Sequence, residues 1–569
     1  MPRVELPFSQ NGHSAESHNG QGLLECGLYK LLPAPLQEVT RENLHLLEYL
    51  HHVPLKEMGI PQFYPRLTPD MQGMERPNLI YPIGRGVFAH ICPSPSGSRD
   101  MYIPVEPVMD ATPLAPLLRE VEERLFDYAD LIAEAETPEE QREVLLRCLD
   151  KAIKGENGHR DLLARLLYKA KPLKVDERER YAINYLMVRD KIGLGVLEPL
   201  IQDRYIEDIS CSGLGPLFIE HKIFRSLQTS IVFDDDEELD AFVIRLAERV
   251  KRPISIARPI VDATLPDGSR INIVYGRHVS QRGSNFTIRK FSSTPLSVLE
   301  LIERGTLNYE MAAYLSLILE EGMNVFVMGE TASGKTTMLN AITTFIPINA
   351  KIVTVEDTPE VQLPHQNWVR EVAAAKEKDG AVTMFELLKA ALRQRPNYII
   401  VGEIRGEEGA IAFQAMQTGH AVMSTFHASS VERLIQRITG NPINIPKSYI
   451  DNLNVVVAMN SVRLPGGQLG RRAVSVAEII GYDPSSDSFS YVEIFRWDPI
   501  TDSFIFSGKM NSYLLENKIA LRRRMRDRRQ IYAELDRRAR LLKRLHEKGV
   551  KGYYELVDVL ASAQRQGLF

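Results

Sequence analysis

The sequence is poor in cysteine and contains no long hydrophobic run. Its four cysteines, Cys26, Cys92, Cys148 and Cys211, are far apart and form no C-x-x-C pair. This spacing argues against a disulfide framework or a zinc site and fits a reducing cytosol. No apolar stretch approaches the roughly 18 residues that a membrane-spanning helix needs, and the N-terminal segment has no apolar part of signal-peptide type. We therefore expect an intracellular, soluble protein whose contact with a membrane is peripheral.

The sequence also lacks a strong excess of charge of one sign. The net charge is −5 over 569 residues, with 25% charged and 44% hydrophobic residues, which is the balance of a globular protein. This charge gives no global reason to expect a nucleic-acid partner. The length predicts about three or four domains.

A phosphate-binding loop is the clearest motif that is present. A G-x-x-x-x-G-K-[ST] pattern follows the apolar run 324–328 and precedes a helical pattern, as in the P-loop of nucleotide-binding proteins. Glycines at both ends let backbone amides curl around phosphate oxygens, and the helix N-terminus adds a favourable dipole. Lys335 would reach the β- and γ-phosphates, and the Thr336 hydroxyl would ligate magnesium. We therefore predict that ATP is bound by Gly329, Glu330, Thr331, Ala332, Ser333, Gly334, Lys335, Thr336 and Thr337, with magnesium held by Thr336.

Acidic residues follow two later apolar runs. Residues 351–355 lead into Glu356 and Asp357, and residues 398–401 lead into Gly402 and Glu403. Alternating strands and helices predict a parallel sheet, in which ligands bind at the carboxyl ends of the strands. One carboxylate can hold the magnesium shell while the other orients and deprotonates the attacking water. The alternative is that these are ordinary exposed acids at strand ends.

A third apolar run, 421–426, lies between His420 and His427. His427 follows the run, at the place where a sensor of the γ-phosphate would be expected. The alternative for either histidine is a structural role.

Four segments together resemble a known family. They are GETASGKT, VTVEDTPE, RQRPNYIIVGEIRGEEG and QTGHAVMSTFHASS, and they are similar, in this order, to the Walker A, aspartate box, atypical Walker B and histidine box of the secretion ATPase superfamily. Members of that family power type II secretion, type IV pili and the archaellum. The resemblance implies that Glu356 is the catalytic acid and that Glu403 lies in the magnesium and water shell. The TLPDGSRIN segment resembles the archaeal and conjugation branches, and no tetracysteine zinc insertion is present.

The resemblance also implies a hexameric ring in which the domain before the motor approaches the nucleotide of the next subunit. Arg282 and Arg289 are then the candidates for catalytic arginines acting in trans, with Arg258 and Arg270 less favoured. An added positive charge there would stabilise the charge that develops during phosphoryl transfer. For each arginine the alternative is a surface ion pair.

We expect an α/β protein with a RecA-like P-loop motor, a preceding α+β domain, and helical additions at both ends. The expected segments are a disordered tail at 1–22, a small N-terminal domain of unknown role at 23–110, a helical region at 111–204, an α+β sheet domain contributing to the nucleotide site at 205–293, the RecA-like ATPase domain at 294–510, and basic C-terminal helices at 511–569.

The basic segment 521–548 holds twelve Lys or Arg against four acidic residues. Its apolar residues recur at helical spacing and predict an amphipathic helix with a cationic face. Two interpretations stay open. The helix packs against its own domain with a solvated outer face, or it docks on an anionic membrane surface or an acidic loop of a membrane partner.

The resemblance implies a homo-hexameric ATPase that powers assembly or export of pilin-like subunits through a polytopic membrane platform protein. Such a motor would lie in the cytoplasm, at the inner face of the cell membrane, without a nucleic-acid partner. A P-loop DNA translocase is the alternative enzyme, and a scaffold that binds ATP without turnover is the alternative outside enzymes.

Overall fold

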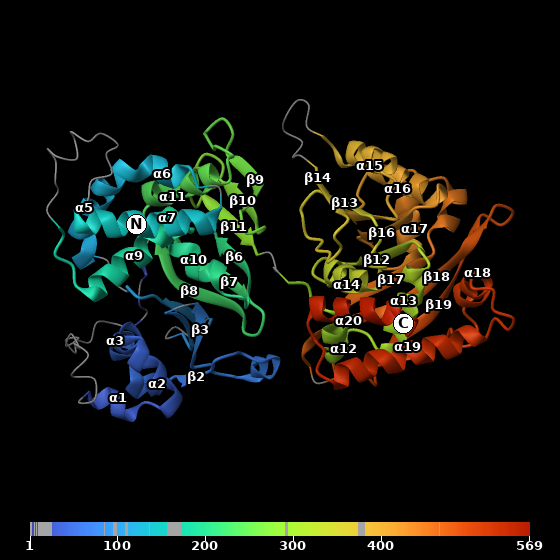
Figure 1. Ribbon diagram of the computed structural model, residues 1–569, viewed down its shortest axis with the longest axis horizontal. Coiled ribbons are helices and arrows are strands. Elements are labelled where there is room, and N and C mark those ends of the chain that lie inside the picture. Colours follow the sequence, from blue (N-terminus) through green and yellow to red (C-terminus); the bar gives the residue numbers. More distant parts are fainter. Residues whose placement is uncertain are drawn as a thin grey trace. The chain divides into compact units, whose positions relative to one another are not determined.

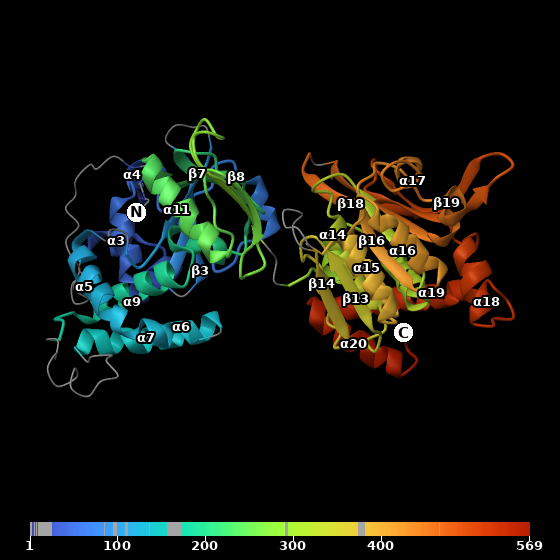
Figure 2. The ribbon, with the colours of Figure 1, turned by 90° about the horizontal axis from the view of Figure 1, so that it is seen from above.

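The computed structural model describes residues 3–4, 6, 8, 26–84, 86–94, 99–108, 112–135, 137–155, 172–290, 294–373, 382–465 and 467–569. The chain divides into two compact units, Met1–Phe291 and Ser292–Phe569, which Figures 1 and 2 show from two directions. Among the described residues, no helix is long and apolar enough to cross a membrane.

One sheet is the framework of the first unit. Its strand order is β2-β3-β4-β5-β8-β7-β6-β11-β10-β9, and β1 pairs with β8. The strands are β1 Arg3–Val4, β2 Gln62–Phe63, β3 Leu79–Gly84, β4 Val87–Cys92, β5 Met101–Val105, β6 Ile206–Cys211, β7 Gly215–His221, β8 Arg225–Phe233, β9 Ile260–Thr264, β10 Arg270–Val274 and β11 Asn285–Arg289.

The sequence predicts a separate small domain at residues 23–110. In the structure β5 pairs in parallel with β8, so β3 to β5 continue the sheet that was expected at 205–293 alone. The expected disordered tail lies mostly outside the described residues, and its Arg3–Val4 segment pairs with β8.

Helices cover both faces of this sheet. They are α1 Gly27–Leu31, α2 Ala34–Glu42, α3 Leu44–His52, α4 Leu55–Met58, α5 Ala115–Leu125, α6 Ala129–Ala133, α7 Pro138–Lys154, α9 Glu177–Lys191, α10 Glu198–Gln202 and α11 Asp236–Arg249. The first three pack with one face of β3 to β5, while α10 and α11 pack on the other face of the sheet. Helix α7 begins with Thr137 in a capping box with Glu140, since the threonine hydroxyl accepts a hydrogen bond from a free backbone amide of the first turn.

The second unit is built on a sheet ordered β14-β13-β15-β16-β12-β17-β18-β19-β20. Its strands are β12 Val325–Gly329, β13 Ile352–Glu356, β14 Trp368–Val372, β15 Tyr398–Glu403, β16 Ala421–Phe426, β17 Val455–Arg463, β18 Leu469–Asp483, β19 Ser488–Asp498 and β20 Ser503–Phe506. Strands β12 to β17 pair in parallel, which confirms the predicted parallel sheet. Strands β18 to β20 extend it in antiparallel fashion.

Alternate side chains of the central strand enter two separate cores. Val325 and Val327 point into one core and Phe326 and Met328 into the other, because successive strand residues face opposite sides of a sheet. The helices are α12 Val298–Glu303, α13 Tyr309–Glu320, α14 Lys335–Ile342, α15 Met384–Arg393, α16 Glu408–Gln417, α17 Val431–Thr439, α18 Ala520–Arg522, α19 Gln530–Glu547 and α20 Tyr553–Arg565. Helices α15 to α17 cover one face and α12 to α14, α19 and α20 the other (Figure 1).

This three-layer arrangement is the α/β, RecA-like motor fold that the sequence predicts. The C-terminal helices belong to the same core as the motor. Phe569, for example, stacks on Phe345 with ring centroids 6.1 Å apart.

Candidate nucleotide-hydrolysis site

The P-loop connects β12 to α14 and requires glycine at both of its ends. A β-carbon at Gly329 would lie 2.3 Å from the carbonyl oxygen of Met459 on β17, which no other residue could accommodate without movement. Gly334 has a φ of 91° at the start of α14, in the left-handed region that glycine adopts at little cost. Between them the Ser333 hydroxyl donates a hydrogen bond to the Glu330 carbonyl oxygen at 2.7 Å. The loop therefore has a fixed, tightly folded shape.

The cationic side chain of the loop lies within it. Lys335 is 8% exposed, and its Nζ donates to the Glu330 carbonyl oxygen at 2.8 Å. Thr336 and Thr337 follow in the first turn of α14, both partly exposed. The backbone amides of this turn have no partner within the helix and favour anions. The geometry suits a bound phosphate chain.

Glu356 ends β13 and is fully buried. Its Oε1 accepts hydrogen bonds from the backbone amides of Glu360 and Val361, at 2.9 and 2.8 Å. Among the residues that the structure describes, its Oε2 has no hydrogen-bond partner, and it forms an ion pair with Arg370, whose Nε lies 3.8 Å away. Burial raises the pKa of Glu356 from 4.5 to about 7, because the lost hydration outweighs these favourable contacts.

Room for Glu356 comes from the neighbouring strand. A β-carbon at Gly402 on β15 would lie 3.1 Å from the Glu356 Cγ. The absence of a side chain at this position therefore leaves space for the carboxyl group.

Glu403 ends β15 in a more polar setting. Arg405 donates to its Oε2 at 2.6 Å, and the same arginine lies 3.6 Å from the Asp357 carboxylate at the end of β13. The Glu403 Oε1 lies 3.3 Å from His427 Nε2. The two acids predicted from the sequence thus lie at the ends of adjacent strands, but in different environments.

His427 follows β16 and contacts Glu403. Burial lowers its pKa, the neighbouring Glu403 raises it, and the positive charge of Lys335 lowers it. His420 lies at the opposite end of the strand, where its Nδ1 is 2.9 Å from the Pro396 carbonyl oxygen.

The two candidate arginines belong to the other unit of the chain. Arg289 ends β11 and pairs in register with Asp208, and Arg282 lies in the preceding turn, where its carbonyl accepts a hydrogen bond from Leu214. Both side chains are exposed.

Three further arginines line the site and were not singled out from the sequence. Arg370 faces Glu356, Arg405 bridges Asp357 and Glu403, and Arg471 Nε donates to the P-loop carbonyl of Ala332 at 3.1 Å. Arg405 lies within RQRPNYIIVGEIRGEEG, one of the four segments that resemble the family. This segment could therefore have identified Arg405 as a residue of the site. Arg370 and Arg471 reach the site through strand pairing, which no local pattern reveals.

A magnesium ion fits the oxygen donors that are present. Thr336 offers a hydroxyl and Glu403 a carboxylate, both hard ligands that Mg²⁺ prefers. Among the described residues, no group of three His, Cys, Asp or Glu side chains could form a metal centre by itself.

Known proteins similar to this chain identify its family. The family described as type II/IV secretion system protein matches residues 190–466. An uncharacterized protein of Methanocaldococcus jannaschii is 44% identical over 541 residues, covering 94% of this chain and 98% of the relative. The type IV secretion system protein PtlH of Bordetella pertussis is 32% identical over 271 residues, covering 43% of this chain and 79% of the relative.

Solved structures are also similar. The VirB11 ATPase of the Brucella suis type IV secretion system has 26% identity and a TM-score of 0.25, covering 48% of this chain and 90% of that one. From the matched family and the sequence relatives, the chain belongs to the type II/IV secretion ATPase superfamily.

Proposed function

We propose that this protein is a homo-hexameric ATPase that hydrolyses ATP to power assembly or export of pilin-like subunits through a polytopic membrane platform protein. The observation that carries the proposal is the pair of acids at the ends of neighbouring strands, the buried Glu356 on β13 and Glu403 on β15 in contact with His427, in the same parallel sheet whose strand β12 leads into the P-loop and Lys335. A lysine for phosphates and two acids in different environments are what nucleotide hydrolysis requires. The protein would work at the inner face of the cell membrane.

In this proposal the P-loop amides and Lys335 hold the phosphate chain. Magnesium, when bound with the nucleotide, neutralises charge on the phosphates, and Thr336 and Glu403 would hold it. Glu356 takes the proton of the attacking water, since a carboxyl group with a pKa of about 7 is half ionised near neutral pH. His427 contacts Glu403 and orients its carboxylate.

We further propose that Arg282 and Arg289 act on the nucleotide of a neighbouring subunit. Both guanidinium groups are exposed, as a group that reaches another subunit must be. Positive charge brought there would stabilise the transition state of phosphoryl transfer. Closure of the first unit on ATP would then couple hydrolysis to movement.

The test is steady-state ATP hydrolysis by the purified protein, with and without long duplex DNA. Glu403→Gln is the inactive reference, and Glu407→Gln, an exposed glutamate at the start of α16, is the matched control that should keep full activity. Magnesium-dependent turnover that DNA does not change supports the secretion motor. Strong stimulation by DNA would instead favour a translocase, and nucleotide binding without turnover, even with membranes present, would favour a scaffold.

A further inference from the structure

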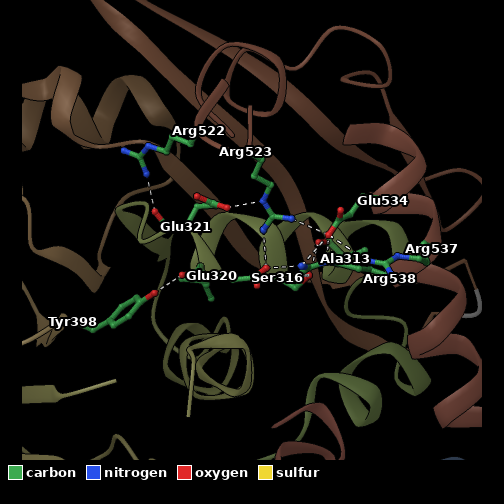
Figure 3. Close-up of polar contacts among 11 residues, drawn as sticks. Ala313, Ser316, Glu320, Glu321, Tyr398, Arg522, Arg523, Glu534, Arg537 and Arg538 are labelled. Atoms are coloured by element: carbon green, nitrogen blue, oxygen red, sulfur yellow. Dashed lines mark hydrogen bonds and ion pairs between the residues drawn. The ribbon is translucent and has the colours of Figure 1, made fainter. Parts of the chain in front are cut away.

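The basic C-terminal segment 521–548 contains two kinds of cation. Arg523 and Arg538 are turned toward the motor core (Figure 3). Arg523 forms ion pairs with Glu320, Glu321 and Glu534, at 2.9, 2.6 and 2.8 Å. Arg538 is 1% exposed and contacts Glu320 and Glu534. These two arginines attach α19 to α13 and are not available to a partner.

The apolar face of α19 is also occupied. Ile531, Tyr532, Leu535 and Leu542 are buried in the core of the second unit. An amphipathic helix enters a membrane through its apolar face. Because this face is covered by the motor itself, α19 can meet a partner only through its outer side.

The outer side is strongly cationic. We call the α19 outer face the exposed Lys and Arg residues on α19 and on the chain directly beside it. They are Arg522, Arg524, Arg526, Arg528 and Arg529 before the helix, Arg537, Arg540, Lys543 and Arg544 on the helix, and Lys548 directly after it. Arg526, Arg540, Lys543 and Arg544 make no side-chain hydrogen bond or ion pair with any residue that the structure describes. Their charges are therefore not paired with an acidic side chain in the described part of the chain.

The spacing aligns these charges. Arg537, Arg540, Arg544 and Lys548 recur every three or four residues, which places them along one side of a helix. Arg537 and Lys548 are eleven positions apart, so the row is about 17 Å long. Such a straight row of cations matches an extended anionic surface better than a single small ligand.

The rest of the chain has the opposite charge. The net charge is −5 although segment 521–548 contributes +8, from twelve basic and four acidic residues, so the remainder carries −13. An anionic surface would repel most of the protein and attract this segment. The charge distribution would therefore orient the protein as well as hold it.

We propose that the α19 outer face docks the protein on an anionic membrane surface by electrostatic contact alone, without insertion. The proposal rests on the membrane-associated role proposed above. Clusters of this size near an anionic leaflet are typical of lipid-headgroup binding. A nucleic-acid surface is less favoured because Tyr532, the segment's one large aromatic residue, is buried, so no base could stack on it.

The proposal is tested with the full chain and vesicles made of equal parts phosphatidylglycerol and phosphatidylcholine. The outer-face variant is the triple change Arg526→Gln, Arg540→Gln and Arg544→Gln. The matched control neutralises three exposed cations on other elements of the same unit, namely Lys389→Gln, Arg433→Gln and Arg496→Gln.

The wild type and the control should sediment with the anionic vesicles and not with phosphatidylcholine alone. The outer-face variant should bind on the order of a hundredfold more weakly, since each cation near the surface contributes substantially to attraction. Salt of about 0.5 M should release the wild type completely, because binding is screened and nothing is inserted. Equal binding of the two triple variants, or no binding of the wild type, would overturn the proposal.

Two further outcomes separate this proposal from others. In the first, duplex DNA competes with the vesicles for the protein. If the DNA concentration that displaces the protein is lower than the lipid concentration that binds it, the α19 outer face binds nucleic acid and the membrane proposal is wrong. ATP hydrolysis is measured on the same samples, because the outer-face residues lie outside the nucleotide site. A wild type that does not hydrolyse ATP would contradict the proposed function. A wild type that hydrolyses ATP but does not bind the anionic vesicles would contradict only the proposed docking surface.

Discussion

Replacing Glu356 by glutamine tests whether burial sets the ionisation of this carboxyl group. The side chain is fully buried, and its pKa rises to about 7 from the ordinary value of 4.5. Between these two values the native state binds more protons than the unfolded state. The free energy of unfolding of the wild type therefore falls as pH rises through this window, and the loss is complete above it.

The size of the effect follows from the same two values. Linkage over a rise from pH 5 to pH 8 gives a loss of about 2.5 kcal/mol in the free energy of unfolding. Glutamine does not ionise, so the Glu356→Gln variant should lack this loss. Its oxygen can keep the amide contacts of Glu360 and Val361, while its NH₂ group has no acceptor, which costs about 1 kcal/mol at any pH. The variant should thus be slightly less stable than the wild type at low pH and more stable at high pH.

Urea unfolding of the nucleotide-free protein at several pH values measures this difference. Both tryptophans of the chain, Trp368 and Trp497, lie in the second unit, so tryptophan fluorescence reports the unfolding of the unit that contains Glu356. Glu360→Gln controls for the loss of one negative charge nearby. A stability difference between Glu356→Gln and the wild type that stays the same from acid to mildly alkaline pH would refute the argument from burial.

Three other substitutions test separate parts of the structure. Arg289→Ala should abolish ATP turnover while leaving the nucleotide Kd nearly unchanged, and equal loss of both would contradict a role in trans. Gly402→Ala should lower kcat about tenfold at similar nucleotide affinity, because its β-carbon would lie 3.1 Å from Glu356 Cγ and displace the carboxyl group; an unchanged kcat would show that the site tolerates the shift. Arg538→Met should lower the free energy of unfolding by about 2 kcal/mol, because it removes the buried one of the two arginines that pair with Glu320 and Glu534 and leaves only Arg523 to do so. Unaltered urea unfolding would show that this cluster does not anchor α19.

The motor core could be predicted from the sequence because its signals are local. Strands β12, β13, β15 and β16 are continuous apolar runs, as expected for strands buried on both faces. The residues that follow such runs meet at one edge of a parallel sheet. The sequence therefore predicts Glu356, Glu403 and His427 at the same edge of the sheet as the P-loop.

The extent of the first sheet could not be predicted, because its signals are not local. Tyr81 and Tyr102 both donate to the Asp203 carboxylate, at 2.6 and 2.8 Å, and so join strands β3 and β5 to a residue far along the chain. In the sequence these are isolated polar residues among apolar ones. The same holds for Arg471, which reaches the P-loop only because β17 pairs with β12 and β18 with β17.

The C-terminal helix shows how two interpretations of one pattern can both describe part of a structure. From the sequence, α19 either packs against its own domain or docks on another surface. In the structure Leu535 and Leu542 are buried in the motor core while Arg540 and Arg544 are exposed, so packing uses one side of the helix and leaves the other side free. Packing also holds the cations in a fixed row, since the helix is already folded and fewer degrees of freedom are lost on binding. An α19 that is anchored by Arg538 is thus better suited to electrostatic docking than a free amphipathic helix, which would have to fold at the membrane.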